Sequence, residues 1–147
     1  MNLVFDANVY FDMLADPDFL DAHGAWLRRV APRTFVSSVV AAELLQGAKG
    51  DLARRRVRRA TASLERAGRV VAPTHEDWIR AGTVQGAIWD RHASLRTKHV
   101  LADILIACSA LRVGATVVTA NARDFALIAS YLPHRAMSFE DAVRTLA

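Results

Sequence analysis

The sequence predicts an α/β sandwich with a central, mostly parallel sheet. Short apolar segments such as residues 3–5 and 115–118 alternate with longer segments in which apolar residues recur at helical spacing. That alternation is typical of a parallel sheet covered by helices. The chain of 147 residues shows no internal repeat, low-complexity stretch or linker, so residues 1–147 are expected to form a single domain.

Five short segments are expected to be strands. They are residues 2–6, 34–36, 69–72 and 115–119, and a last segment near Ala136 and Met137. The first is a short buried strand, because residues 3–5 are Leu, Val and Phe.

Four helices are expected between the first and third strands. Asn8 can cap a helix over residues 9–15, and the turn at residues 16–18 leads into a second helix that runs through Arg29. Ser37 or Ser38 caps a third helix, which ends near Gly47. The fourth extends from Asp51 to Gly68, and its apolar stripe consists of Ala53, Val57, Ala60 and Leu64.

Four more helices are expected in the second half of the chain. One covers residues 76–91, and a polar segment at 93–99, expected to be a mobile loop, separates it from a helix over 101–113. Another begins near Ala122. Ser138, with Asp141 three residues later, resembles a capping box for the C-terminal helix.

Composition restricts the class of protein. No stretch approaches the roughly 18 uninterrupted apolar residues of a membrane span, and residues 1–6 do not resemble a signal peptide. The single cysteine, Cys108, allows no internal disulfide, which fits a reducing compartment and predicts a cytoplasmic protein.

Positive charge is concentrated in one part of the chain. The net charge is +4, and 11 of the 19 Lys and Arg residues lie between Arg28 and Arg69. Such a concentration attracts nucleic acid or an acidic partner. The alternative is that these arginines simply form the solvated faces of Arg-rich helices.

Four carboxylates interrupt or follow apolar segments. Asp6 follows residues 3–5, Glu43 lies between two apolar runs, Asp103 lies within residues 100–108, and Asp124 follows the apolar run at 115–118. A buried carboxylate is costly unless a partner or a metal neutralises it. Because the carboxyl ends of parallel strands are where ligands gather, we expect these side chains to converge there.

Such a set of carboxylates indicates metal-assisted phosphodiester chemistry. Mg²⁺ and Mn²⁺ prefer oxygen ligands, activate water and stabilise the departing oxygen of a phosphodiester. Zinc is disfavoured because His75, His92 and His99 lack the close spacing of zinc ligands and are expected on the surface or in loops.

Each carboxylate also has a simpler explanation. Asp6 could only cap the following helix, Glu43 could lie on the polar edge of its helix, and Asp124 could be placed by the helix dipole. Asp103 is the hardest to explain in this way, because its neighbours are apolar on nearly every side.

Four segments carry a resemblance to a known family. They are residues 4–9 (VFDANV), 37–44 (SSVVAAEL), 101–107 (LADILIA) and 117–125 (VVTANARDF). In this order and spacing, the chain resembles the PIN-domain ribonucleases, and specifically the VapC-like toxins of type II toxin–antitoxin systems. Each segment alone is weakly specific, whereas the four together are strongly so, and the resemblance spans nearly the whole chain.

The resemblance implies a three-layer α/β/α PIN-like sandwich and an acidic quartet at Asp6, Glu43, Asp103 and Asp124. It implies that Asp6 and Asp103 are ligands of Mg²⁺, that Mn²⁺ can substitute, and that Glu43 and Asp124 complete the site directly or through water. Asn8 and Thr119 match polar positions beside the metal.

Two positions depart from the family pattern. Ala7 stands where many relatives carry Thr or Ser, which removes a hydrogen bond, and Asn121 stands where some relatives carry an acid. The number of metal ions therefore stays open.

The expected function is that of a Mg²⁺-dependent endoribonuclease acting as a toxin, with RNA as substrate, a cognate antitoxin as partner and a homodimer as the assembly. Products would carry 5′-phosphate and 3′-hydroxyl ends. The alternative is a metal-dependent regulator that binds nucleic acid or antitoxin without turnover. A phosphotransferase using Asp6 as nucleophile is disfavoured because position 8 is Asn rather than a second Asp.

Two further groups of residues each allow more than one role. One is the set of arginines on the fourth helix, which could contact RNA phosphates or an acidic antitoxin segment, or could be only a solvated face: Arg54, Arg55, Arg56, Arg58 and Arg59. The other is Trp78 and Trp89, whose spacing on one helix fits the core or a dimer interface better than stacking on RNA bases.

Overall fold

A five-stranded parallel sheet forms the centre of the protein. The computed structural model describes residues 1–146. The strand order is β3-β2-β1-β4-β5, and all neighbouring strands run parallel. The strands are β1 (Asn2–Phe5), β2 (Thr34–Ser37), β3 (Val70–Val71), β4 (Ala115–Thr119) and β5 (Arg135–Ser138).

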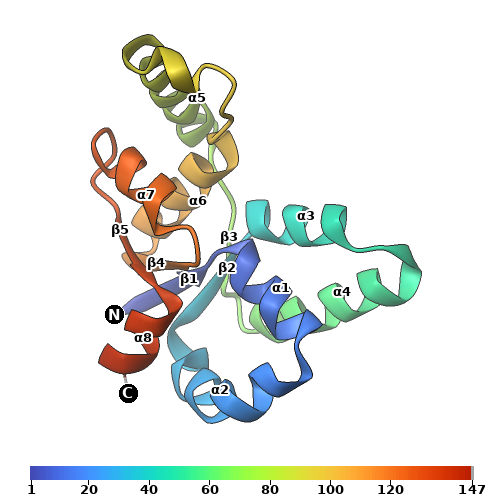
Figure 1. Ribbon diagram of the computed structural model, residues 1–147. Coiled ribbons are helices and arrows are strands. Elements are labelled where there is room, and N and C mark those ends of the chain that lie inside the picture. Colours follow the sequence, from blue (N-terminus) through green and yellow to red (C-terminus); the bar gives the residue numbers. More distant parts are fainter. Residues whose placement is uncertain (147) are drawn as a thin grey trace.

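Helices cover both faces of this sheet, as predicted for a three-layer α/β/α sandwich (Figure 1). The helices are α1 (Ala7–Ala15), α2 (Pro17–Val30), α3 (Ser38–Gly47), α4 (Gly50–Arg66), α5 (His75–Arg91), α6 (Leu101–Arg112), α7 (Ala122–Ala129) and α8 (Phe139–Thr145). Helix α6 packs along β1, β2, β3 and β4 on one face. On the other side α8 meets α2, where Phe139 packs against Phe19 and Trp26.

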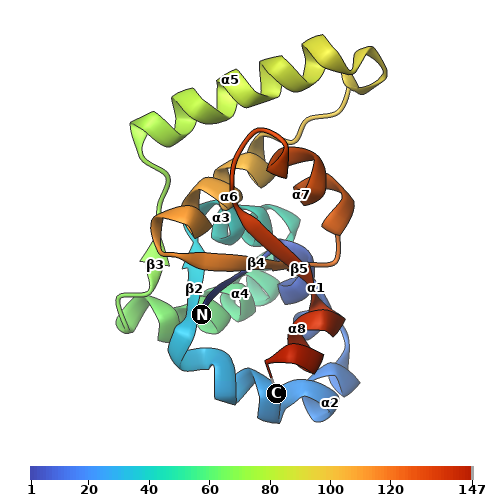
Figure 2. The same ribbon diagram turned by 90° about the vertical axis from the view of Figure 1, so that its left-hand side faces the viewer.

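Helix α5 lies at the outside of the molecule. Figure 2 shows it crossing above α6, and its buried residues include Ala81, Val84 and Ile88. Most of its remaining residues are exposed, and Figure 2 shows the connection that leads from its end to the start of α6.

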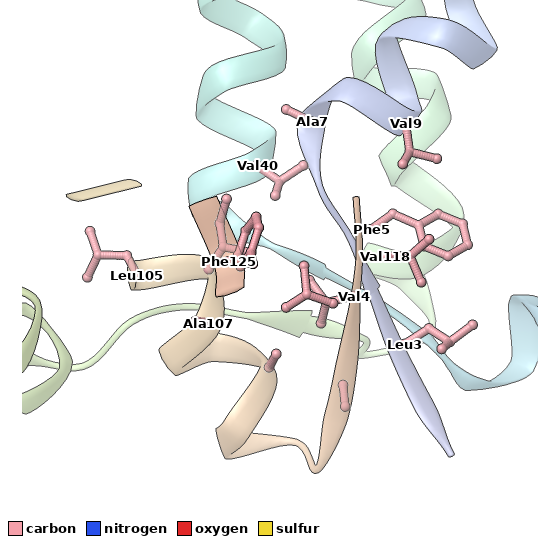
Figure 3. Packing of buried hydrophobic residues seen from close by; sticks show 14 of the residues in the cluster. Leu3, Val4, Phe5, Ala7, Val9, Val40, Leu105, Ala107, Val118 and Phe125 are labelled. Atoms are coloured by element: carbon pink, nitrogen blue, oxygen red, sulfur yellow. The ribbon is translucent and has the colours of Figure 1, made fainter. Parts of the chain in front are cut away.

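The core forms on both sides of the two central strands. Residues alternate across a strand, so Val4 faces Phe125 of α7 while Leu3 and Phe5 face the opposite side, where Val9 lies (Figure 3). All five residues of β4 are buried, as expected for a parallel strand covered on both faces. Each fully buried large apolar side chain contributes about 1.5–3 kcal/mol.

The helix caps agree with the sequence in most places but not at α1. Ser37 caps α3 and Ser138 caps α8, as predicted. The prediction that Asn8 caps the first helix is wrong, because α1 begins directly after the strand and Asp6, in an extended conformation, accepts a hydrogen bond from the Ala7 amide. Asn8 is already inside the helix and turns its side chain toward β4.

Two further segments differ from expectation. The third strand is only Val70–Val71, shorter than the predicted 69–72, since it pairs with β2 alone at the edge of the sheet. The segment expected to be a mobile loop contains a short 3-10 helix, Ala93–Leu95, and is tied to α5 by side-chain hydrogen bonds. Within residues 1–146, no helix is both long and apolar enough to cross a membrane.

Candidate active site

The four predicted carboxylates lie on four elements around the carboxyl ends of the central strands. Asp6 directly follows β1, and Asp124 lies in the first turn of α7, after β4. Asp103 lies in the first turn of α6, and Glu43 lies within α3, after β2. These placements agree with the positions predicted from the sequence.

Asp6 is buried and held by three donors. One carboxylate oxygen accepts from the Ala7 amide at 2.8 Å. The other accepts from the Thr119 hydroxyl at 2.8 Å and from the Asn8 amide at 3.0 Å. Burial raises the pKa of Asp6, and these hydrogen bonds counteract part of that rise. The carboxylate is therefore fixed in orientation at the centre of the site.

Thr119 and Asn8 join the ends of β1 and β4. The Thr119 side chain accepts from the Asn121 amide at 2.9 Å and from the Asn8 side chain at 3.2 Å. Asn8 in turn accepts from the Ala120 amide at 3.1 Å. Both residues thus occupy the supporting positions that the sequence suggested for them, next to Asp6.

Asp103 experiences the charges of the other three acids. Burial, followed by repulsion from Asp6, Glu43 and Asp124, raises the pKa of Asp103 to about 7. Burial and the charge of Asp6 also raise the pKa of Glu43. Burial and neighbouring negative charge thus disfavour the ionised forms of Asp103 and Glu43, and a divalent cation bound nearby would relieve that repulsion.

Asp124 is bound by two side chains of the protein. The Lys98 ammonium forms an ion pair with one carboxylate oxygen, and the Asn121 side chain donates to the other at 2.5 Å. The position that is acidic in some relatives thus carries, in this chain, an amide that orients Asp124. The positive charge of Lys98 also acts on Asp103, where it opposes part of the rise in the pKa of that side chain.

Lys98 is the residue that the sequence analysis missed. It lies in a polar segment 26 positions from Asp124, so no local pattern connects the two. The one unusual feature of Lys98 in the sequence is that it is a lysine, since the chain contains 17 arginines and only two lysines.

Within residues 1–146, no three His, Cys, Asp or Glu side chains form a ready metal-binding group. The chemistry of the donors still fits Mg²⁺, which keeps several water ligands and uses one or two carboxylates. Asp6 and Asp103 would supply such oxygens, and a cation would relieve the repulsion between them.

The comparison with protein families matches the PIN domain over residues 3–130. The chain belongs to the PIN domain family. No curated protein sequence is significantly similar to it.

Several solved structures of VapBC and FitAB proteins have the same fold. The DNA-bound VapBC of Salmonella typhimurium is 23% identical, with a TM-score of 0.64, and the match covers 94% of this chain and 98% of that one. FitAB bound to an IR36 DNA fragment is 20% identical, with a TM-score of 0.65 and coverages of 92% and 94%. VapBC2 of Rickettsia felis, bound to a DNA fragment from its promoter, is 18% identical, with a TM-score of 0.59 and coverages of 95% and 99%. The fold of this PIN domain is therefore that of VapC-like proteins.

The arginines of α4 lie outside the acidic site of this PIN domain. All five are exposed on the helix, while Val57 between them is buried. Arg54 pairs with Asp51 and Arg58 with Glu65, each at 3.5 Å. We call this surface the α4 basic face; it consists of Arg54, Arg55, Arg56, Arg58 and Arg59.

The two tryptophans of α5 have different environments. Trp78 is 51% exposed and lies beside Ile79, which is 54% exposed, so Trp78 does not belong to the core. Trp89 is partly buried, and its indole N–H donates to the Lys98 carbonyl at 2.9 Å. Trp89 therefore holds the segment that carries Lys98.

Proposed function

We propose that this PIN domain is a Mg²⁺-dependent endoribonuclease and the toxin of a type II toxin–antitoxin pair. The observation that carries the proposal is the placement of four carboxylates around the carboxyl ends of the central strands. Burial, and then the charges of the other three acids, raise the pKa of Asp103 to about 7, which agrees with this placement. A site lined by several carboxylates can bind a divalent cation, and the bound cation can in turn contact the anionic backbone of RNA.

Mg²⁺, when bound, would supply activation of water and neutralisation of the charge that develops on the phosphate. Asp6 would hold the cation, and its carboxylate is oriented by hydrogen bonds from Thr119, Asn8 and the Ala7 amide. Asp103 and Glu43 present their carboxylates from two other elements, and Asp124 completes the set from α7. We assign Asp6 and Asp103 as metal ligands, and Glu43 and Asp124 as residues that act directly or through water. Mn²⁺ is expected to replace Mg²⁺.

RNA is the proposed substrate, and the α4 basic face is its proposed accessory surface. Exposed guanidinium groups bind phosphates without reading the base sequence. Hydrolysis by attack of water leaves 5′-phosphate and 3′-hydroxyl ends, whereas attack by the ribose 2′-hydroxyl would leave a 2′,3′-cyclic phosphate.

The proposed partners are a cognate antitoxin and a second copy of the chain. The structural neighbours are complexes of VapB with VapC and of FitA with FitB. An apolar groove of about 180 Å³, lined by Phe11, Leu14, Leu44 and Val57, provides a surface for an antitoxin segment. The exposed Trp78 and Ile79 provide an apolar patch for a dimer contact. Buried, unbridged Cys108 fits the proposed location in the reducing cytoplasm.

Cleavage of total cellular RNA tests the proposal. Antitoxin-free wild type and Asp103→Asn are each incubated with Mg²⁺ and with EDTA, and the fragment ends are mapped. We expect discrete cuts by the wild type only, abolished by EDTA, with 5′-phosphate ends. If both proteins bind RNA but neither cuts it, the regulator without turnover is the better assignment. Equal cutting by both proteins would indicate a contaminating nuclease.

A further inference from the structure

We propose that Lys98 is a phosphate-binding residue of this site, held by Asp124 so that its ammonium contacts the RNA backbone next to the bond that is cut. The inference rests on the proposed function and adds a basic residue to the acidic set. It follows from the ion pair of Lys98, from its exposure and from the way its backbone is fixed.

The ion pair leaves most of the Lys98 ammonium available. Within the described part of the chain, its one hydrogen-bond acceptor is Asp124, and an ammonium has three N–H donors. The side chain of Lys98 is 39% exposed, whereas that of Asp124 is 10% exposed. The remaining donors have no acceptor within the described part of the chain, and the partly exposed side chain is open to a phosphate oxygen from solvent.

Asp124 is suited to hold a lysine rather than to act alone. Both of its oxygens accept hydrogen bonds from the protein, one from Lys98 and one from Asn121. Asn121 is itself held through its backbone amide by Thr119, which also donates to Asp6. One connected set of hydrogen bonds thus links the lysine to the carboxylate at the centre of the site.

The backbone of Lys98 is fixed by α5. Its carbonyl accepts from the Trp89 indole at 2.9 Å and from the Gln85 amide at 3.4 Å. Two residues later, the Val100 amide donates to the Gln85 side chain at 2.8 Å. Gln85 is buried, so this clamp is part of the packed α5–α6 contact. Figure 2 shows the clamped segment between the end of α5 and the start of α6.

The charges of the site explain why a lysine is useful there. When all four carboxylates are ionised, as a bound cation would favour, they carry more negative charge than one Mg²⁺ neutralises, and the RNA phosphate adds to the excess. A lysine offers a compact positive charge with rotatable donors. The competing explanation is that Lys98 only neutralises Asp124 and is displaced when a metal binds.

The experiment compares Lys98→Gln with Lys98→Arg and with the matched control Lys49→Gln, the chain's other lysine. Binding of a fluorescent single-stranded RNA is measured by anisotropy in EDTA, so that no metal contributes. Mn²⁺ affinity of the RNA-free proteins is measured by calorimetry, and single-turnover cleavage is measured in Mg²⁺.

We expect Lys98→Gln to bind RNA about tenfold more weakly in EDTA, the lower end of the loss of one charge-assisted hydrogen bond. Its cleavage rate at saturating RNA should fall at least tenfold, while Mn²⁺ affinity stays equal or increases. Lys98→Arg should recover most of the RNA binding, and Lys49→Gln should stay within twofold of wild type in all three measurements.

Two results would overturn the proposal. One is RNA binding by Lys98→Gln within twofold of wild type. The other is tighter Mn²⁺ binding together with undiminished cleavage, which would make Lys98 a counter-ion of Asp124 only.

If Lys98→Gln is poorly folded by circular dichroism, the double variant Lys98→Gln/Asp124→Asn removes both charges together and is expected to show the same weakened RNA binding. If the wild type binds RNA through Lys98 but never cuts it, the phosphate contact stands and the nuclease assignment fails.

Discussion

Replacing Asp103 with Asn should stabilise the metal-free protein at pH 8 while abolishing its activity. Burial and three neighbouring carboxylates raise the pKa of Asp103 from 3.8 to about 7. The folded protein therefore disfavours the ionised form of this side chain. Above neutral pH the side chain is ionised, and this lowers the stability of the folded state relative to the unfolded chain. Asn has a similar shape and no charge, so it removes that cost.

The magnitude follows from the shift in pKa. The rise from 3.8 to about 7 corresponds to a ceiling of about 4 kcal/mol. Asp103 is only partly buried, so solvent screening reduces this to about 1–2 kcal/mol. For a chain of this length, such a gain raises Tm by about 3–8 °C.

The sign of the pH dependence distinguishes this cause from others. A carboxyl whose pKa is raised by folding binds more protons in the native state between pH 4 and 7, so the cost grows as the pH rises through that range. The stability difference between Asp103→Asn and wild type should thus be largest at pH 8. It should fall to less than half of that value at pH 5 and vanish below about pH 4.

Thermal unfolding in EDTA at pH 5 and pH 8 measures these differences. Asp90→Asn, an exposed acid on α5, is the matched control and should change the free energy of unfolding by less than about 0.5 kcal/mol at either pH. Added Mg²⁺ should then stabilise the wild type more than Asp103→Asn, because ligand binding adds to stability only where the site is intact. An Asp103→Asn protein that is no more stable than wild type at pH 8, or whose advantage is equal at both pH values, would refute the assigned cause.

Three further predictions concern the hydrogen bonds of Asp6, the α4 basic face and the proposed dimer contact. Thr119→Val removes the hydroxyl that donates to Asp6 and accepts from the Asn121 amide. We expect the free energy of unfolding to fall by about 1–3 kcal/mol and Mn²⁺ to bind about 10–100-fold more weakly by calorimetry. Unchanged Mn²⁺ binding would contradict the role given to Thr119. Arg55→Gln/Arg59→Gln on the α4 basic face should lower the salt dependence of RNA binding by about 0.7 in log–log slope per lost phosphate contact, whereas Arg144→Gln, paired with Asp141 on α8, should not. Trp78→Ser/Ile79→Ser should shift the protein from dimer to monomer in sedimentation experiments without changing the circular dichroism spectrum, and a wild type that is monomeric at all concentrations would remove the basis for this contact.

The fold class was predictable because its signals are local. Apolar residues 3–5 and 115–118, separated by helical patterns, were enough for a parallel α/β sheet, and the family match over residues 3–130 confirms the resemblance drawn from four short segments. Ser37 and Ser138 were recognisable caps because capping depends on a side chain and an amide two or three residues away. The misassigned cap at Asn8 shows the limit: whether Asp6 or Asn8 starts the helix depends on where β1 ends against its neighbours.

Local sequence could single out a set of carboxylates because an acid among apolar residues is costly if the fold buries it. Asp6, Glu43, Asp103 and Asp124 were found in this way, although their catalytic roles remain proposals. The contacts of these carboxylates, in contrast, depend on how the elements pack together. The Asp6–Thr119 hydrogen bond and the Lys98–Asp124 ion pair join residues distant in the chain, and the sheet order and the packing of α5 on α6 bring them together. Local sequence patterns indicate whether a segment is a helix or a strand and which side chains are costly to bury. Contacts between distant residues depend on the distances between elements, which are set only when the core packs.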